Sequence, residues 1–187
     1  MKYQLIKLAM AKWLRRKPLH SEFFNPPQIT VEKRLRYDHT LTSPAPDYSG
    51  IIFSSEGERV GIAVYALSPL NDCLYLYEII IDKNFVRRGY GLAVLQYLAQ
   101  TYRQPIIPVH ELESAERFWD AARRYVTDVE VRESISVSDF DMERHRWAFL
   151  KPESDRLQEQ ISARLMRGES WEEAVGRGLD ATSTPSE

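Results

Sequence analysis

The sequence has one cysteine, Cys73, among 187 residues. A single cysteine excludes an intrachain disulfide and a zinc site built from several thiolates, and we interpret Cys73 as a small buried or half-buried residue. No stretch approaches the roughly eighteen consecutive apolar residues that a membrane span needs. Lys7 and Lys12 interrupt the apolar residues near the N-terminus, which argues against a signal peptide. The four histidines and the cysteine show no metal-ligand spacing. We therefore expect a cytoplasmic protein with no transmembrane segment and no metal.

Charge is distributed unevenly along the chain. Residues 1–36 contain nine lysines and arginines against two glutamates, whereas residues 111–187 contain eleven against eighteen acidic residues. The basic and acidic ends are candidates to pair within one chain or in a homodimer. Alternatively, the basic residues contact the phosphates of a nucleic acid or an anionic membrane, or simply face solvent. Helical spacing of apolar residues predicts an amphipathic helix within residues 1–20: Tyr3, Ile6, Met10, Trp13 and Leu14.

The first half of the chain is rich in strand patterns. Residues 28–36 alternate like a strand, and "GIIFSS" and "RVGIAVYAL" predict a hairpin joined through "EGE". The run "LYLYEIII" (74–81) is typical of a central strand that is covered on both faces. Apolar residues then recur at helical spacing up to Pro105: Leu92, Leu95, Leu98, Ala99 and Tyr102.

The second half predicts a short strand at 105–110, a helix at 114–125, and two late strands in "DVEVRESISV" and "RHRWAFL". Leu157, Ile161 and Leu165 then indicate a helix, and Ser170 with Glu173 forms a capping-box pattern for another.

We divide the chain into a helix at 1–20, a domain at 28–150, a helical extension at 151–177 and a disordered tail at 178–187. The composition, 43% hydrophobic and 28% charged, suits one domain with extensions.

A glycine-containing turn joins the buried strand to the helix in "FVRRGYGLAVL" (85–95). Gly89 and Gly91 permit backbone conformations closed to other residues. Several N–H groups and the positive end of the helix dipole converge on such a turn, and Arg87 and Arg88 flank it. This arrangement favours an anion such as phosphate. A purely structural turn is the alternative.

The stretch "IIIDKNFVRRGYGLAVLQYL", within residues 74–102, resembles the acetyl-CoA motif of the GNAT superfamily of N-acyltransferases. More loosely, "SAERFW" resembles the signature on that family's following helix. The resemblance implies an α/β (α+β) fold with a strongly curved mixed sheet of about seven strands flanked by helices. It also implies acetyl-CoA as co-substrate, with its pantetheine arm between two splayed parallel strands.

The resemblance assigns the cofactor site residue by residue. The pyrophosphate of CoA is expected on the N–H groups of the turn, and backbone groups of the preceding strand are expected to bind the pantetheine. Val86 occupies the position where the family usually has Gln or Arg; a competing register begins at Arg88 instead. The expected cofactor-binding residues are Ile79, Ile81, Val86, Arg87, Arg88, Gly89, Tyr90 and Gly91.

Acetyl transfer also needs a group that removes a proton from the acceptor amine. Glu78 lies among apolar residues of the 74–81 strand, where loss of hydration would make its carboxylate a better proton acceptor. Pairing with an arginine on a neighbouring strand is the alternative role, and His110 is a second candidate base. Trp119 stands where the family often has a tyrosine that returns a proton to the thiolate, so Tyr125 or water is expected to replace it.

Two functions follow from the sequence. The first is an acetyl-CoA-dependent N-acetyltransferase acting on an amine of a small molecule or a protein. The second is a catalytically weak acyl-CoA-binding module that engages a protein or nucleic-acid partner. Residues 37–48 leave no room for the two helices that the family usually places there, so the acceptor is not specified.

Overall fold

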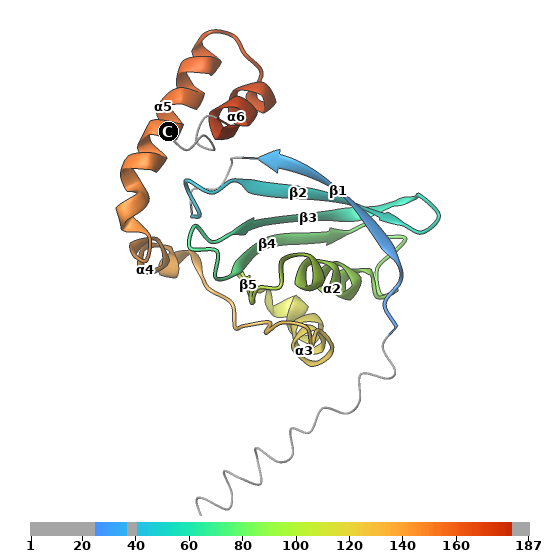
Figure 1. Cartoon of the computed structure of the whole chain (residues 1–187). Helices are drawn as coiled ribbons and strands as arrows, with labels where there is room; N and C mark the ends of the chain where they lie inside the picture. Colours follow the sequence, from blue (N-terminus) through green and yellow to red (C-terminus); the bar gives the residue numbers. More distant parts are fainter. Residues whose placement is uncertain (1–24, 37–40, 181–187) are drawn as a thin grey trace, which may run out of the picture.

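The computed structural model describes residues 25–36 and 41–180, which form a mixed five-stranded sheet in the order β1-β2-β3-β4-β5 (Figure 1). Neighbouring strands are antiparallel up to β4, and β5 runs parallel to β4. The predicted hairpin is confirmed as β2 and β3. The strands are β1 (Ile29–Arg36), β2 (Asp47–Ser54), β3 (Arg59–Leu67), β4 (Leu74–Ile81) and β5 (Ile106–Pro108).

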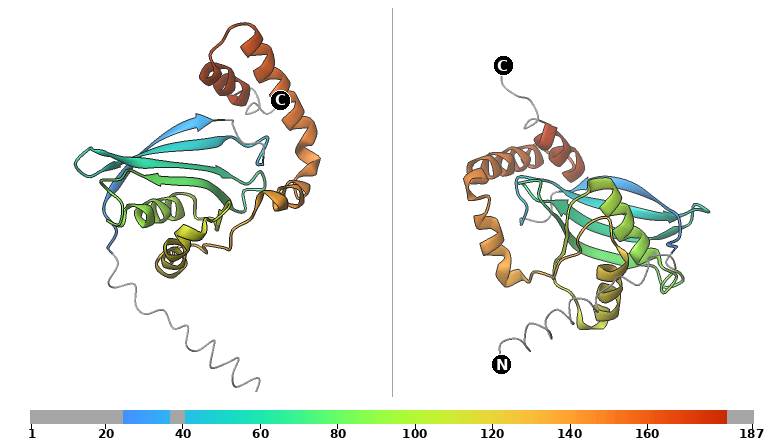
Figure 2. Two further views of the ribbon diagram at one scale, coloured as in Figure 1. Left: turned by 180° about the vertical axis from the view of Figure 1, so that it is seen from behind. Right: turned by 60° about the horizontal axis from the view of Figure 1, so that its bottom comes forward.

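Helix α2 (Tyr90–Tyr102) makes the crossover that two parallel strands require. Its apolar side packs on the sheet in the main core, where Leu95 and Leu98 are almost fully buried. Helix α3 (Glu116–Tyr125), which follows the short helix η2 (Glu113–Ala115), lies on the same side of the sheet as α2 (Figure 2). The predicted helices at these positions are confirmed.

The opposite face of β4 is covered by the chain after α3. This segment contains η3 (Val137–Asp139), α4 (Phe140–His145) and η4 (Ala148–Leu150). A second core cluster forms there from Leu41, Cys73, Tyr75, Ile107 and Trp147, so Cys73 is buried as expected. Strand β4 is thus covered on both faces at its beginning.

The sheet has five strands in the described part of the chain, not the expected seven or so. Residues 128–137 run beside β5 but make only isolated bridges, Ile106 to Val131 and Val109 to Ile135. Pro108 accounts for the interruption, because it has no N–H to donate to this segment. The hydrogen bonds before and after Pro108 are out of register by one residue, since the N–H of Ile106 donates to Glu130 and that of His110 to Ile135.

The strand predicted in "RHRWAFL" is also wrong, because this segment is helical. Ser136 and Asp139 form a reciprocal capping box, with the Ser136 N–H and hydroxyl each donating to the Asp139 carboxylate at 2.8 Å. Apolar residues then follow at helical spacing and face the second core: Phe140, Trp147 and Leu150. The helical part of the chain therefore begins at Val137 rather than near residue 151.

Two further helices, α5 (Lys151–Met166) and α6 (Trp171–Asp180), pack on each other through Leu157, Ile161, Ala174 and Val175. The predicted capping box at Ser170 and Glu173 is present. Helix α6 lies against β1, away from α2 and α3 (Figure 1). Residues 178–180, predicted to be disordered, belong to α6. The predicted helix at 1–20 and the tail from 181 lie outside the described residues.

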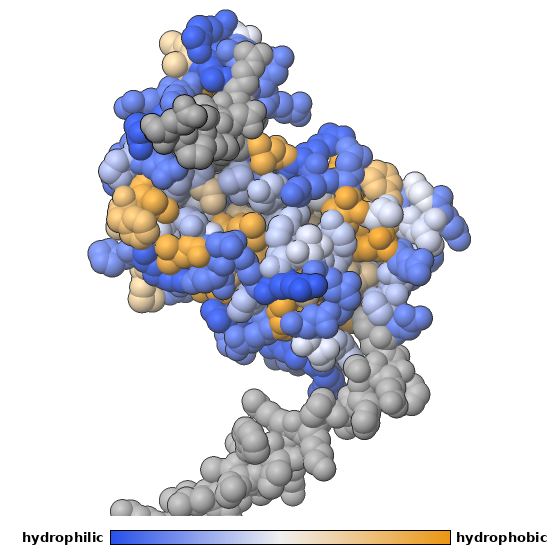
Figure 3. Space-filling view, viewed as in Figure 1, coloured by the Kyte–Doolittle hydropathy of each residue, from blue (hydrophilic) through white to orange (hydrophobic). Residues whose placement is uncertain are grey.

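The surface in Figure 3 is mostly hydrophilic, with apolar side chains in separate patches. Within the described ranges, no helix is both long enough and apolar enough to cross a membrane.

Candidate functional site

A β-bulge interrupts β4 at the middle of the sheet. Val64 of β3 lies opposite Glu78, and Tyr65 lies opposite Leu76, so Tyr77 is an extra residue. A bulge changes which face the following side chains take. Leu74 and Leu76 pack in the main core beneath α2, and after the bulge Ile79 and Ile81 pack there instead.

Strands β4 and β5 separate at this bulge. Their pairing joins residues 74–76 to residues 106–108, and the last contact is a 2.9 Å bond from the Val109 N–H to the Leu76 carbonyl. His110 then has a left-handed backbone, with φ of 60°, and its N–H donates to Ile135 at 2.8 Å. The edge of β4 that carries Glu78 and Ile79 is therefore not paired with β5.

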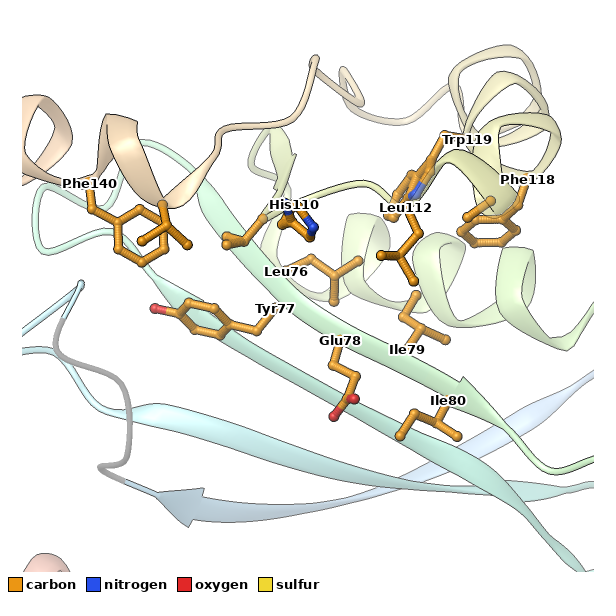
Figure 4. A pocket seen from close by; sticks show the side chains of 13 residues that line it. Leu76, Tyr77, Glu78, Ile79, Ile80, His110, Leu112, Phe118, Trp119 and Phe140 are labelled. Carbon is orange, nitrogen blue, oxygen red and sulfur yellow. The ribbon is translucent and has the colours of Figure 1, made fainter.

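The separation opens a cavity of about 610 Å³, which we call the Glu78 cavity (Figure 4). In the figure, Ile79 lies on the side of Leu112, whereas Glu78 points to the opposite side of the strand. The lining residues come from four segments: residues 76–80; Val109, His110 and Leu112; Ala115, Phe118 and Trp119; and Val137 and Phe140. Glu78 and His110, the two candidate bases, therefore share one cavity.

Glu78 is exposed, so the burial on which the sequence argument relied is not present. The reason is the bulge and the separation of the strands, because beyond Leu76 the edge of β4 that faces β5 is no longer paired with it. The ion pair that the sequence offered as an alternative is not among the salt bridges of the described residues. Glu78 thus lines the cavity and is exposed to solvent.

Tyr77 contributes its ring, not its hydroxyl, to this cavity. Its hydroxyl oxygen is buried near Thr42 and Asp47, both fully buried. Burial raises the pKa of the Tyr77 phenol, the Thr42 hydroxyl acts in the opposite direction, and the Asp47 charge adds to the rise. The phenol is therefore protonated at neutral pH.

A second cavity of about 500 Å³ lies at the glycine turn, and we call it the turn cavity. Gly89, with φ of 87°, precedes the first residue of α2, and Arg87 is also left-handed at 60°. The first helical bond runs from the Ala93 N–H to Gly89 at 3.0 Å. The N–H groups of residues 90–92 precede this bond and form the donor end of the helix.

Gly91 is required by packing. A Cβ at this position would lie 2.8 Å from the Phe118 ring. The absence of a side chain lets α3 approach the start of α2, and Phe118 consequently borders both cavities. Ile79 and Ala115 also line both. The turn cavity and the Glu78 cavity are therefore neighbours along β4.

The structure brings most of the predicted cofactor residues together. The turn cavity is lined by Ile79, Ile81, Val86, Arg87, Gly89, Tyr90 and Gly91. Arg88 does not line it; its guanidinium lies 5.6 Å from the centre of the Phe85 ring. Val86 is half exposed and lines the cavity. Gly89 directly precedes α2, which agrees with the motif register that starts at Val86 and not with the one that starts at Arg88.

Trp119 lines the Glu78 cavity, whereas Tyr125 lines neither cavity. Tyr125 is the last residue of α3 and packs against the main core, nearly two helical turns from Trp119. Three further lining residues were not predicted from the sequence: Tyr77, Val137 and Phe140. The capping pattern of Ser136 and Asp139 was the signal that could have placed Phe140 at the start of a helix.

A polar network holds α4 beside the cavity. The Tyr75 hydroxyl donates to Glu143 at 2.5 Å, and the Arg146 guanidinium donates to Glu143 at 2.8 Å and to Tyr75 at 3.1 Å. Arg146 also pairs with Asp72. The hydrogen bond with Glu143 is the largest cause of the raised pKa of Arg146. This network anchors the helix that begins with Phe140.

The described residues contain no cluster of three or more His, Cys, Asp or Glu side chains that could hold a metal ion.

Comparison with known proteins identifies the family. Residues 9–127 match the model of the acetyltransferase (GNAT) family. A crystal structure of nourseothricin acetyltransferase is similar to part of the chain, with 15% identity and a TM-score of 0.27 over 42% of this chain and 57% of that one. The match therefore spans less than two thirds of that protein. No curated protein matches the sequence. Since the family model covers more than half of the sequence, the chain belongs to the acetyltransferase (GNAT) family.

Proposed function

We propose that the protein is an acetyl-CoA-dependent N-acetyltransferase whose acceptor is a primary amine of a small molecule or a protein. The observation that carries this proposal is the adjacency of the two cavities, which share Ile79, Ala115 and Phe118. A cofactor held at the turn can extend along β4 and present its thioester beside Glu78.

The turn cavity suits the CoA moiety because its donors belong to the main chain. The N–H groups of residues 90–92 and the Arg87 side chain offer hydrogen bonds and positive charge to a pyrophosphate. The edge of β4 at Ile79 and Ile81 is not paired with β5, so its backbone groups are available to the pantetheine amides. Val86 does not weaken this assignment, because the cradle does not depend on its side chain.

Glu78 is the group proposed to take the proton. An amine that enters the Glu78 cavity as an ammonium loses one proton to this carboxylate, directly or through water. The neutral nitrogen attacks the thioester carbonyl carbon and the C–N bond forms. The nitrogen then releases its second proton to water as the C–S bond breaks, which leaves the amide and the thiolate of CoA. His110, in the same cavity, is the second candidate base.

The leaving thiolate takes its proton from water in this proposal. Trp119 stands in the cavity, but an indole N–H is not an acid at neutral pH. Tyr125, the other candidate, lies outside both cavities.

The experiment measures acetyl-CoA binding by calorimetry and free thiol release with a panel of amines. Gly89→Ala tests the turn and Gly57→Ala is its control, because Gly57 has a similar φ of 83° in the open β2–β3 turn. Both replacements strain the backbone, but only Gly89→Ala should weaken binding, by about tenfold or more, which is about 1.4 kcal/mol. Equal binding by both variants contradicts the assignment.

Turnover separates the two functions. Amine-dependent thiol release supports the transferase. Binding without release for every amine supports the weak acyl-CoA-binding module, and no binding by the wild type contradicts both.

A further inference from the structure

The walls of the Glu78 cavity are apolar apart from a few groups. Among the described residues that line it, Glu78 is the one acidic side chain and His110 the one basic side chain, while the others are aliphatic or aromatic. Tyr77 adds to the aromatic surface, because its hydroxyl oxygen is buried away from solvent near Thr42 and Asp47. A ligand in this cavity therefore meets a single negative charge from the described part of the chain.

The mouth of the cavity is also apolar. Leu112 and Val137 line it and are 60% and 70% exposed, and Ile80 is 47% exposed. Exposed apolar side chains that converge on one cavity mark a surface for a ligand that is itself apolar. They belong to three separate segments of the chain, which the fold brings to one opening.

We propose that the acceptor is a primary amine with one positive charge on an apolar, preferably aromatic, body, and not a polycationic amine. This inference rests on the proposed function. A single carboxylate can pair with a single ammonium, whereas a second ammonium would lose hydration against walls that offer it no second carboxylate among the described residues. An apolar body instead removes those walls from water.

The size of the cavity fits such an acceptor. Its volume of about 610 Å³ lies within the range of small-molecule sites, so a short alkyl or phenylalkyl chain can be enclosed while its nitrogen lies near Glu78. Each buried methylene is expected to raise kcat/KM by about fourfold until the cavity is filled.

The test uses matched acceptors with the full-length protein and saturating acetyl-CoA. Hexylamine and 1,6-diaminohexane differ chiefly in a second ammonium, and propylamine, butylamine and pentylamine give the dependence on chain length. We expect kcat/KM to rise from propylamine to hexylamine, and to be at least about tenfold higher for hexylamine than for the diamine, a difference of about 1.4 kcal/mol. 2-Phenylethylamine should be among the best substrates.

Val137→Ser tests the mouth, and Met142→Ser is its control, because both side chains are 70% exposed but Met142 does not line the cavity. Val137→Ser should flatten the dependence on chain length while leaving acetyl-CoA affinity unchanged, because Val137 does not line the turn cavity. Met142→Ser should behave as the wild type. The Val137 comparison remains informative because an exposed position tolerates serine.

Several outcomes overturn the inference. A diamine that is acetylated as well as hexylamine, or a chain-length dependence that Val137→Ser does not change, contradicts it. Acetyl-CoA binding without turnover of any apolar amine contradicts it as well. If polycationic amines are the good substrates, this inference fails while the proposed function stands. The proposed function itself fails if acetyl-CoA does not bind.

Discussion

The turn cavity and the Glu78 cavity are neighbours, but they are built in different ways. All residues of the turn cavity except Ala115 and Phe118 fall within residues 79–92, a strand end, a turn and the start of a helix. The Glu78 cavity combines four segments, and its outer wall comes from the chain after α3. The turn cavity is therefore formed mainly by one local segment, whereas the Glu78 cavity depends on the whole fold.

The two cavities also differ in chemistry. The turn offers main-chain N–H groups and the charge of Arg87, which suit an anion whatever the neighbouring side chains. Among the described residues, the Glu78 cavity offers one carboxylate and one imidazole among apolar side chains, and a substitution can change any of these side chains. We therefore expect substitutions to separate cofactor affinity from acceptor turnover.

The largest separation is expected for Glu78→Gln. The amide keeps the size of the side chain but cannot accept the proton, so kcat should fall by about 10²-fold or more. Acetyl-CoA affinity should stay within about twofold of the wild type, because a change of that size is well under 1 kcal/mol. Thiol release and calorimetry give the two values. Glu58→Gln, on an exposed side chain of the β2–β3 turn, is the control. A Glu78→Gln variant with near-normal kcat would move the proposed base to His110 or water.

Arg87→Gly is expected to have a smaller effect of the opposite kind, because it should weaken acetyl-CoA binding without changing turnover. Arg87 and Arg103 both have left-handed backbones, with φ of 60° and 54°, so glycine suits either position. Loss of the Arg87 side chain should raise the Kd for acetyl-CoA by about fivefold, since a hydrogen bond typically contributes about 1 kcal/mol. Turnover at saturating acetyl-CoA should be unchanged. Arg103→Gly, at the end of α2, should leave both values unchanged. Equal Kd values for the two variants would show that Arg87 does not contact the cofactor.

The smallest effect concerns Asp72, which pairs with Arg146 and so holds the α4 side of the Glu78 cavity. Partial burial acts to raise the pKa of Asp72, but hydrogen bonds and the Arg146 charge outweigh it, so the folded pKa lies below the ordinary 3.8. The stability that Asp72 contributes is thus present above pH 3.8 and is lost as the pH falls through the folded pKa.

Asp72→Asn should therefore lower the free energy of unfolding at neutral pH by at most about 1 kcal/mol, the usual value for an exposed pair. The difference from the wild type should shrink below pH 3.8, where the wild-type carboxylate becomes protonated. Urea unfolding across the pH range measures it. A difference that grows in acid would contradict the lowered pKa. Acetyl-CoA affinity should not change, because the turn cavity does not contact α4.

Local construction explains which features could be predicted from sequence. The β4–turn–α2 unit carries its own signals in strand composition, glycines and helical spacing, and it is confirmed. The predictions of the two late strands were wrong for different reasons. Pro108 interrupts the pairing of residues 128–137 with β5, and the capping residues Ser136 and Asp139 start a helical segment where the alternating pattern predicted a strand. The exposure of Glu78 depends on how far β5 pairs with β4, which the residues of β4 alone do not encode. The Val137 and Phe140 wall is likewise a product of the tertiary fold.

Backbone amide NMR during two successive titrations tests the central claim most directly. Acetyl-CoA alone should shift the amide signals of residues 86–92, Ile79 and Ile81, and a subsequent unreactive apolar amine analogue should shift those of Tyr77, Glu78 and Phe140. Two adjacent sets of shifted residues that meet at Ile79 and Phe118 are the result that the structure predicts. Shifts from acetyl-CoA that leave residues 86–92 unmoved, or an amine that shifts residues outside the Glu78 cavity, would contradict it.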